Sequence, residues 1–177
     1  VLIRPRSGNF VYSEIEFKMM KQNIERCKKL GFNGIVSGVL NPDSTIDVQR
    51  TKELIKLSKP LSFTFHRAFD CVKGPKKALQ ELMNLDVDRV LTSGLKDKAI
   101  EGIELLIELQ KIARNKLIIL PGSGINPENT SLFKVAGFKE IHASASKVVP
   151  QKNASSFENI QQTVSNIDTI REILNFM

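Results

Sequence analysis

The sequence predicts an α/β fold with a parallel sheet, and three observations support this. Six short aliphatic and β-branched runs alternate with six amphipathic helical patterns. Each strand–helix unit takes roughly 28 residues, close to the ~30 expected when about 250 residues build eight units of a parallel barrel. No domain boundary interrupts the pattern, so residues 1–177 are predicted to form one domain.

The first predicted strand covers residues 1–3, and a capping box follows it. Ser13 precedes Glu16 by three residues, the spacing at which the two ends of a capping box bond to each other. Gly31 suits the left-handed position just past the end of a helix. Between them, apolar residues repeat at intervals of three and four, which predicts a helix buried on one side. They are Phe17, Met20, Ile24 and Cys27.

The second and third units repeat this pattern. Residues 34–40 predict a strand, after which Asp47 can cap a helix. The predicted buried residues of that helix are Val48, Leu54 and Ile55. Residues 61–65 predict the next strand, and Pro75 lies where proline is tolerated in the first turn of the following helix.

Three more units follow. Strands are predicted at 89–91, 117–120 and 140–143, each before a helix. The first of these helices carries Ile103, Leu106, Ile107 and Leu109 on its apolar side. Asn126 and Pro127 begin the second helix and Gly137 ends it. The polar stretch 147–159 is predicted as a loop before a last helix at about 165–176.

Strands that are buried on both faces and joined by helices build either a doubly wound open sheet or a (β/α)8 barrel. Six units cannot close an eight-stranded barrel. Because Val1 already lies inside a predicted strand, the simplest interpretation is a TIM-type (β/α)8 barrel that is N-terminally incomplete. About six of its eight units are then present, with strands three to eight.

Composition excludes several classes of protein. The net charge is 26 − 19 = +7, but the basic residues are spread along the chain without a nucleic-acid recognition motif. No apolar run approaches the roughly 18 residues of a membrane span. Two cysteines, Cys27 and Cys71, are too few for a disulfide scaffold or a structural zinc site. We expect a cytoplasmic protein, with nuclear presence also compatible, and neither nucleic acid nor membrane as a partner.

Functional groups of a parallel α/β sheet gather where strands end and loops begin. At these ends, His66, Arg67 and Asp70 are candidates for a general acid or base, a charge anchor and an orienting carboxylate. The alternative is that each rim residue only satisfies a neighbouring hydrogen-bonding group. The candidates for anion binding are Arg4, Arg6, Thr92, Ser93, Gly122, Ser123, Gly124 and His142; Ser37, Ser144 and Ser146 also end strands.

Two of these groups have a specific argument. Arg4 and Arg6 are two apart, so in an extended strand both side chains face the same way and can hold one carboxylate or phosphate. Residues 122–124 lie between a strand and a helix start, where glycines let backbone N–H groups approach an anion. A plain turn is equally compatible with these glycines. The residue types leave open whether the protein is an enzyme.

For metals the sequence offers little. Cys27 lies on the apolar side of the first predicted helix and is expected to be a core thiol. Cys71 follows the strand-end segment of His66 and is a weak candidate for a soft metal such as Cu(I).

Five segments, taken together and in order, resemble the CutC copper-homeostasis family. They are residues 3–10, 63–70, 90–94, 120–124 and 142–145. The resemblance implies a (β/α)8 barrel, cytoplasmic and often oligomeric, that handles copper and binds Cu(I). It also implies copper as the metal partner and a homo-oligomer as the assembly.

The resemblance has a limit at the N-terminus. Full-length members carry two further strand–helix units before the segment that matches 1–6, and these hold the cysteines associated with copper. None of them maps onto this sequence, so the resemblance assigns no metal ligand here. Ser7 and Ser123 stand where members usually have glycine. Two hypotheses follow: a Cu(I)-handling protein, or a barrel enzyme acting on a small anionic metabolite with a phosphate or carboxylate.

Overall fold

The computed structural model describes residues 1–149 and 162–176, and its helices and strands alternate as predicted. The elements are α1 (Glu14–Lys29), β1 (Gly34–Ser37), α2 (Val48–Ser58), β2 (Ser62–Phe65), the 3-10 helix η1 (Arg67–Cys71), α3 (Pro75–Asn84), β3 (Arg89–Thr92), α4 (Ile103–Ala113), β4 (Ile118–Pro121), α5 (Pro127–Val135), β5 (Ser146–Val148), β6 (Thr163–Ser165) and α6 (Ile167–Phe176).

The main sheet is parallel and keeps the order of the chain, β1-β2-β3-β4. The first predicted strand forms a parallel bridge to β1, at one edge of the sheet. There the Ile3 N–H donates to the Val36 carbonyl at 2.8 Å. The sixth predicted strand adds a bridge at the other edge, between His142 and Gly122. Six parallel segments therefore lie side by side, and the parallel α/β prediction is confirmed.

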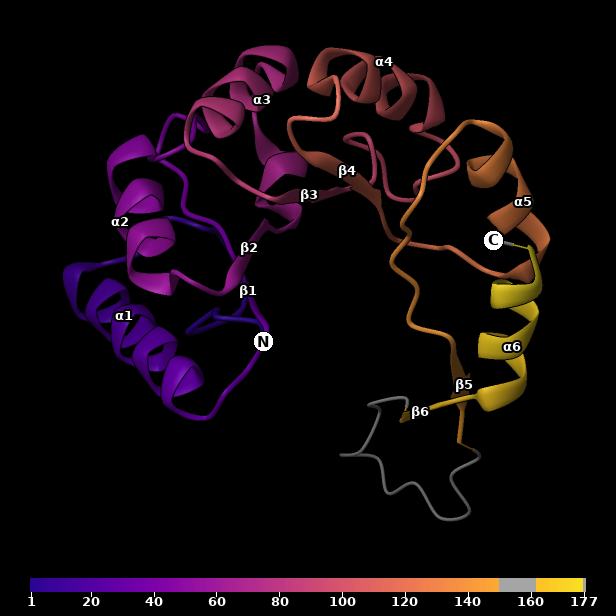
Figure 1. Ribbon diagram of the computed structural model, residues 1–177, viewed down its shortest axis with the longest axis horizontal. Helices are drawn as coiled ribbons and strands as arrows, with labels where there is room; N and C mark the ends of the chain where they lie inside the picture. Colours follow the sequence, from indigo (N-terminus) through magenta and orange to yellow (C-terminus); the bar gives the residue numbers. More distant parts are fainter. Residues whose placement is uncertain (150–161, 177) are drawn as a thin grey trace, which may run out of the picture.

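The sheet lines the inside of an open arc. In Figure 1 the helices α1 to α5 follow one another around the outside of the arc, and the strands lie on its inner side. The arc is open between α1 with the N-terminal segment and the β5–β6 hairpin. The six parallel segments do not close on themselves, so the carboxyl ends of the strands form one continuous curved rim.

Burial on the outer face follows the predicted periodicity. α1 buries Phe17, Met20, Ile24 and Cys27 against the sheet side, as predicted. Its capping box is present, because Ser13 and Glu16 bond to each other's backbone N–H. Gly31 ends the helix region with φ +74°. The core that results is made of aliphatic and phenylalanine side chains between the sheet and the helices.

Two local predictions in the N-terminal half were wrong. Val48 is 38% exposed instead of buried. It is the first residue of α2, and helical side chains lean toward the N-terminus, so its side chain projects past the packed turns. The strand predicted at 34–40 ends at Ser37.

The C-terminal boundaries also differ. The last helix begins at Ile167, two residues later than predicted, because Thr163–Ser165 pairs with Ser146–Val148 as an antiparallel hairpin. The start of the predicted polar loop, residues 147 and 148, thus belongs to a strand. Residues 150–159 of that predicted loop lie outside the described residues.

Candidate functional site

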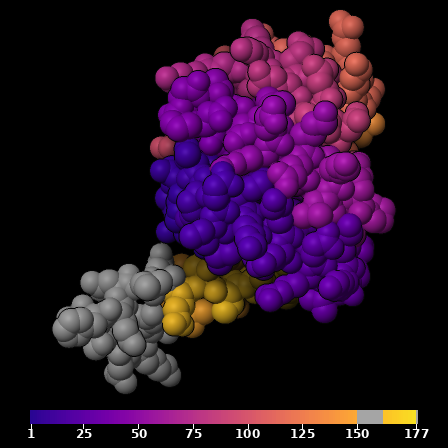
Figure 2. Space-filling model, turned by 90° about the vertical axis from the view of Figure 1, so that its left-hand side faces the viewer, coloured from indigo at the N-terminus to yellow at the C-terminus, as the bar shows by residue number. Residues whose placement is uncertain are grey.

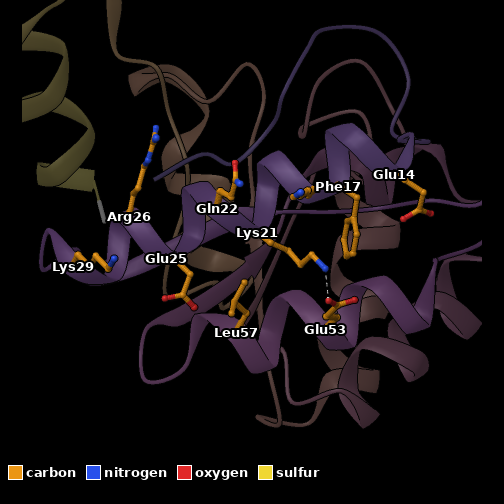
Figure 3. A pocket seen from close by; sticks show the side chains of 10 residues that line it. Glu14, Phe17, Lys21, Gln22, Glu25, Arg26, Lys29, Glu53 and Leu57 are labelled. Carbon is orange, nitrogen blue, oxygen red and sulfur yellow. Dashed lines mark hydrogen bonds and ion pairs between the residues drawn. The ribbon is translucent and has the colours of Figure 1, made fainter.

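A large groove of about 920 Å³ lies between α1 and α2, the helices that form much of the face in Figure 2. Its lining carries charges of both signs. Lys21 of α1 donates to Glu53 of α2 at 2.6 Å across the groove (Figure 3). These side chains are surface groups that pair with one another in water, where ion pairs contribute little. Buried functional groups occur instead at the carboxyl ends of the strands.

Asp70 is the centre of a dense hydrogen-bond network at this rim. Its side chain is only 9% exposed and accepts from the backbone N–H groups of Ser93 at 3.0 Å and Leu95 at 3.2 Å. The Thr92 hydroxyl also donates to it, and the Ser93 hydroxyl lies 3.1 Å away. The Arg67 guanidinium completes the set through Nε at 2.7 Å. Asp70 is therefore held from several directions.

Local sequence explains why these groups meet. η1 follows β2 directly and places Arg67 and Asp70 three residues apart, on one side of its turn. β3 pairs with β2 and ends at Thr92, so Ser93 reaches the same place from the neighbouring strand. The turn after it needs Gly94, with φ +71°, because a Cβ there would lie 2.4 Å from the Gly102 carbonyl oxygen.

His66 lies at the end of β2 and is 5% exposed. Its Nδ1 accepts from the Ala68 backbone N–H at 3.2 Å. Burial, with a smaller contribution from the positive charge of Arg4, lowers the pKa of His66 to about 4. The ring is therefore neutral at pH 7, and because Nδ1 is an acceptor, the ring proton lies on Nε2.

Arg4 and Arg6 take different roles. Arg4 lies over the Phe10 ring, with its Cζ 4.6 Å from the ring centroid, and donates to the Gly8 carbonyl at 2.6 Å. Phe10 also packs on His66, with 4.9 Å between ring centroids. Arg6 donates five hydrogen bonds within the chain, to the loop of residues 7–11 and to Glu16. Because guanidinium has five N–H donors, Arg6 is fully used in holding this loop.

The loop of residues 122–124 extends the rim toward the other edge of the sheet. The Gly122 N–H donates to the Thr92 carbonyl at 3.0 Å, and the Ser123 hydroxyl donates to the Asp97 carbonyl at 2.7 Å. At the start of α5, Asn126 accepts from two N–H groups of the first turn. These donors are thus satisfied inside the chain. His142 is exposed beside Gly122.

The structure thus brings the predicted residues together in two adjacent groups. Arg67, Asp70, Thr92 and Ser93 form one network, and Arg4 and His66 meet around Phe10. Sequence reasoning missed Phe10 and Tyr12 as site residues. Two aromatic residues that alternate just after a pair of arginines are a usable signal, since guanidinium groups stack on aromatic faces.

The described residues do not fit a copper site. Within 1–149 and 162–176, no group of three or more His, Cys, Asp and Glu side chains is placed to hold a metal ion. Cys27 is buried in the core, as predicted. Cys71 is exposed on the wall of a depression of about 400 Å³, which the loop of residues 8–11 also lines. One thiol is a poor ligand set for Cu(I), which prefers several soft donors.

No helix in the described part of the chain is both long and apolar enough to cross a membrane.

Comparison with known proteins gives one consistent match. A family model described as the CutC family matches residues 1–147. A CutC family protein of Parabacteroides distasonis is 44% identical over 161 residues, which cover 90% of this chain and 66% of the relative. A CutC family protein of Chromobacterium violaceum is 42% identical over 145 residues, 81% of this chain and 59% of the relative.

A solved structure agrees in fold. The crystal structure of CutC from Streptococcus agalactiae, a protein assigned provisionally to copper homeostasis, has a TM-score of 0.76 and 32% sequence identity. The match covers 80% of this chain and 70% of that chain. This chain spans 59 to 66% of the length of the curated relatives it matches.

Proposed function

This chain belongs to the CutC family, and from that premise we propose that it binds a small anionic compound, carrying a phosphate or carboxylate, at the carboxyl ends of its strands. Ligands of parallel α/β proteins bind at this end because the loops converge there.

The observation that carries this proposal is the environment of Arg67. Its guanidinium is fixed by Asp70 and by the Ser93 hydroxyl at 3.0 Å, yet 42% of the side chain stays exposed. A guanidinium held in place loses little side-chain entropy when it binds a ligand, and its planar fork matches carboxylate and phosphate. Arg67 therefore suits the role of the charge anchor that its position predicts.

The neighbouring groups support an enzyme that acts on this compound. His66 is neutral and comes directly before Arg67 at the end of β2, so an uncharged imidazole and the anchored charge belong to the same rim. The exposed His142, beside Gly122, continues the same rim and is the candidate for a second contact, whereas the donors described for residues 122–124 are used within the chain. Arg6 is left out of this proposal because its donors are used within the chain.

The test measures thermal unfolding with inorganic phosphate or sodium acetate added at constant ionic strength. Binding to the folded state raises the midpoint as the anion concentration passes its dissociation constant. We expect Arg67→Ala to weaken binding roughly tenfold or more, since hydrogen bonds to charged groups are the strong ones. Arg26→Ala, an exposed arginine of α1, is the matched control and is expected to bind like the native chain. Equal shifts in both variants would contradict the proposal.

Copper handling in the cytoplasm is the second candidate, favoured by the family and by the provisional assignment of the Streptococcus agalactiae protein. We propose that this chain by itself binds Cu(I) weakly, because Cys71 is the only exposed thiol among the described residues. A competition titration against a Cu(I) chelator checks this, with Cys71→Ser expected to remove the weak site and Cys27→Ala to leave it. Tight stoichiometric binding would overturn it.

The six parallel segments are proposed to be part of an eight-unit barrel, which the relatives' greater length and the TM-score of 0.76 support. Apolar side chains are exposed at both ends of the arc: Leu2 in the first strand segment and Leu174 on α6, the last helix. We propose that copies of the chain associate through such edges, since exposed sheet edges and apolar patches promote pairing. Sedimentation of the 177-residue chain is expected to show oligomers, and a single monomer species would contradict this.

A further inference from the structure

Three buried polar atoms lack hydrogen-bond partners within the described part of the chain and belong to the N-terminal side of the rim. They are Nε of Arg4, the hydroxyl oxygen of Tyr12 and Nε2 of His66. Tyr12 is 3% exposed and His66 is 5% exposed. Folded proteins pair almost all such groups, so three in one region require an explanation.

The three residues form one cluster. Arg4 and His66 both pack on the Phe10 ring. The charge of Arg4 helps to lower the pKa of His66. Burial raises the pKa of Tyr12, and both the charge of Arg4 and a hydrogen-bonding contact from its guanidinium to the hydroxyl oxygen oppose that rise. Such a contact uses the oxygen as an acceptor and leaves the hydroxyl proton free to be donated. Arg4 therefore connects the other two residues: it shares the Phe10 ring with His66, and its side chain acts on the Tyr12 hydroxyl.

All three groups can donate a hydrogen bond there. The Nε of Arg4 is only a donor, and the Tyr12 hydroxyl carries a proton at neutral pH. His66 uses Nδ1 as an acceptor from Ala68, which leaves its proton on Nε2 as a third donor. The nearest carboxylate partner of this loop, Glu16, is already engaged by Arg6 and by the Ser13 N–H. The cluster thus offers donors and one positive charge without a matching acceptor.

We propose that Arg4, Tyr12 and His66 form a buried pocket for the oxyanion of the ligand, receiving a carboxylate or phosphoryl oxygen that accepts from all three donors. This inference rests on the proposed function and deepens it: it adds Tyr12 as a binding residue and makes His66 a neutral hydrogen-bond donor instead of a proton carrier. The depression of about 400 Å³ beside it is lined by Phe10, and it accommodates the remainder of the compound.

The test compares two variants that each remove one unpaired buried hydroxyl. Tyr12→Phe removes the hydroxyl of the proposed pocket. Thr51→Val is the matched control, because the Thr51 hydroxyl is also buried and unpaired but lies on α2, outside the rim. The probes are inorganic phosphate and sodium acetate, with affinity measured by isothermal titration at constant ionic strength. Arg4→Lys, which keeps the charge and lacks Nε, is the second pocket variant.

We expect Tyr12→Phe to weaken binding of the probe anion roughly tenfold, and Arg4→Lys to weaken it at least as much, while Thr51→Val binds like the native chain. In the absence of anion, both hydroxyl deletions are expected to leave the unfolding temperature unchanged or higher, since neither removes a made hydrogen bond.

Two failures are distinguishable. In the first, the native chain binds the anions and Arg67→Ala weakens that binding, but Tyr12→Phe and Arg4→Lys bind like the native chain. The proposed pocket is then wrong, and the proposed function stands. If neither anion binds the native chain, the proposed function fails as well. A loss of unfolding temperature in Tyr12→Phe alone would also overturn the pocket, because it would show that the hydroxyl already has a partner.

Discussion

The two polar groups at the rim differ in how fully they are satisfied. Around Asp70, carboxylate, hydroxyls, backbone N–H groups and guanidinium all pair with one another. A few residues away, Arg4, Tyr12 and His66 each keep a buried donor without a partner in the described chain. Both groups are built at strand ends of the same sheet, from similar residue types.

This difference indicates that one group mainly supports the fold of the rim and the other is suited to bind a ligand. A network whose members are all paired rigidifies its surroundings, whereas unpaired buried donors destabilise the unliganded protein and strengthen the contact with a suitable acceptor. The Asp70 network therefore holds the rim and the half-exposed Arg67 guanidinium in place. The Arg4 cluster is where a ligand oxygen gains most. Four measurements test this contrast.

The largest effect is expected from Asp70→Ala. The change leaves the Ser93 and Leu95 N–H groups and the Thr92 hydroxyl without their acceptor. We expect the free energy of unfolding in urea to fall by about 3 kcal/mol, less than for a fully buried ion pair because Arg67 is partly exposed. Asp168→Ala, at an exposed ion pair, is the control, with a change of less than about 0.5 kcal/mol. Equal losses would show that the network does not support the fold.

The second effect is a pH dependence that belongs to His66. Its pKa is lowered to about 4 in the folded protein, against 6.5 for a solvent-exposed imidazole, so between these two pH values the unfolded state binds a proton that the folded state does not bind. The contribution of neutral His66 to the free energy of unfolding is fully present above pH 6.5. It is lost as the pH falls from 6.5 toward 4, by about 3 kcal/mol in total. Urea unfolding at pH 7.0, 5.5 and 4.5 measures this.

His66→Gln is the reference for that series, because it keeps a side-chain hydrogen-bond donor and does not titrate. The difference between native chain and variant is expected to shrink with falling pH, while the carboxylates titrate equally in both. Parallel curves for the two proteins would show that His66 is not buried as a neutral ring.

The third measurement disturbs the cluster sterically. A Cβ at position 38 would lie 2.7 Å from Nδ1 of His66 and 3.1 Å from the Phe65 ring. We expect Gly38→Ala to lower the free energy of unfolding by about 2 kcal/mol, as overpacking does. Gly74→Ala is the matched control, since its nearest neighbour would be 3.9 Å away. If the two variants unfold alike, the position of the His66 ring beside Gly38 is disproved.

The smallest effect is expected from Ser93→Ala. The hydroxyl accepts from Arg67 and lies between the Lys96 carbonyl and Asp70, but the Ser93 backbone N–H still donates to the carboxylate after the change. We expect a loss of about 1 kcal/mol, and a smaller loss when Asp70 is already alanine, because residues of one network are not additive. Additive losses in this double-mutant cycle would contradict a shared network.

Much of the rim was predictable from the sequence. His66, Arg67 and Asp70 follow one strand, and Thr92 and Ser93 follow the next, so parallel pairing alone brings them to one edge. Tyr12 and Phe10 were not predictable in the same way. They lie in the loop between the first strand segment and α1, where no periodicity indicates which side chains are buried.

The sequence by itself determined the alternation of strands and helices, the capping box at Ser13, the core face of α1 and the set of polar residues at the strand ends, because these follow from local spacing and residue type. Only the tertiary structure decided that Arg6 is used within its own loop and that Asp70 accepts from several donors. It also decided that Arg4, Tyr12 and His66 keep donors without a partner among residues 1–149 and 162–176. The reason is physical: whether a buried group is paired depends on tenths of an ångström between segments distant in the chain, which no local pattern records.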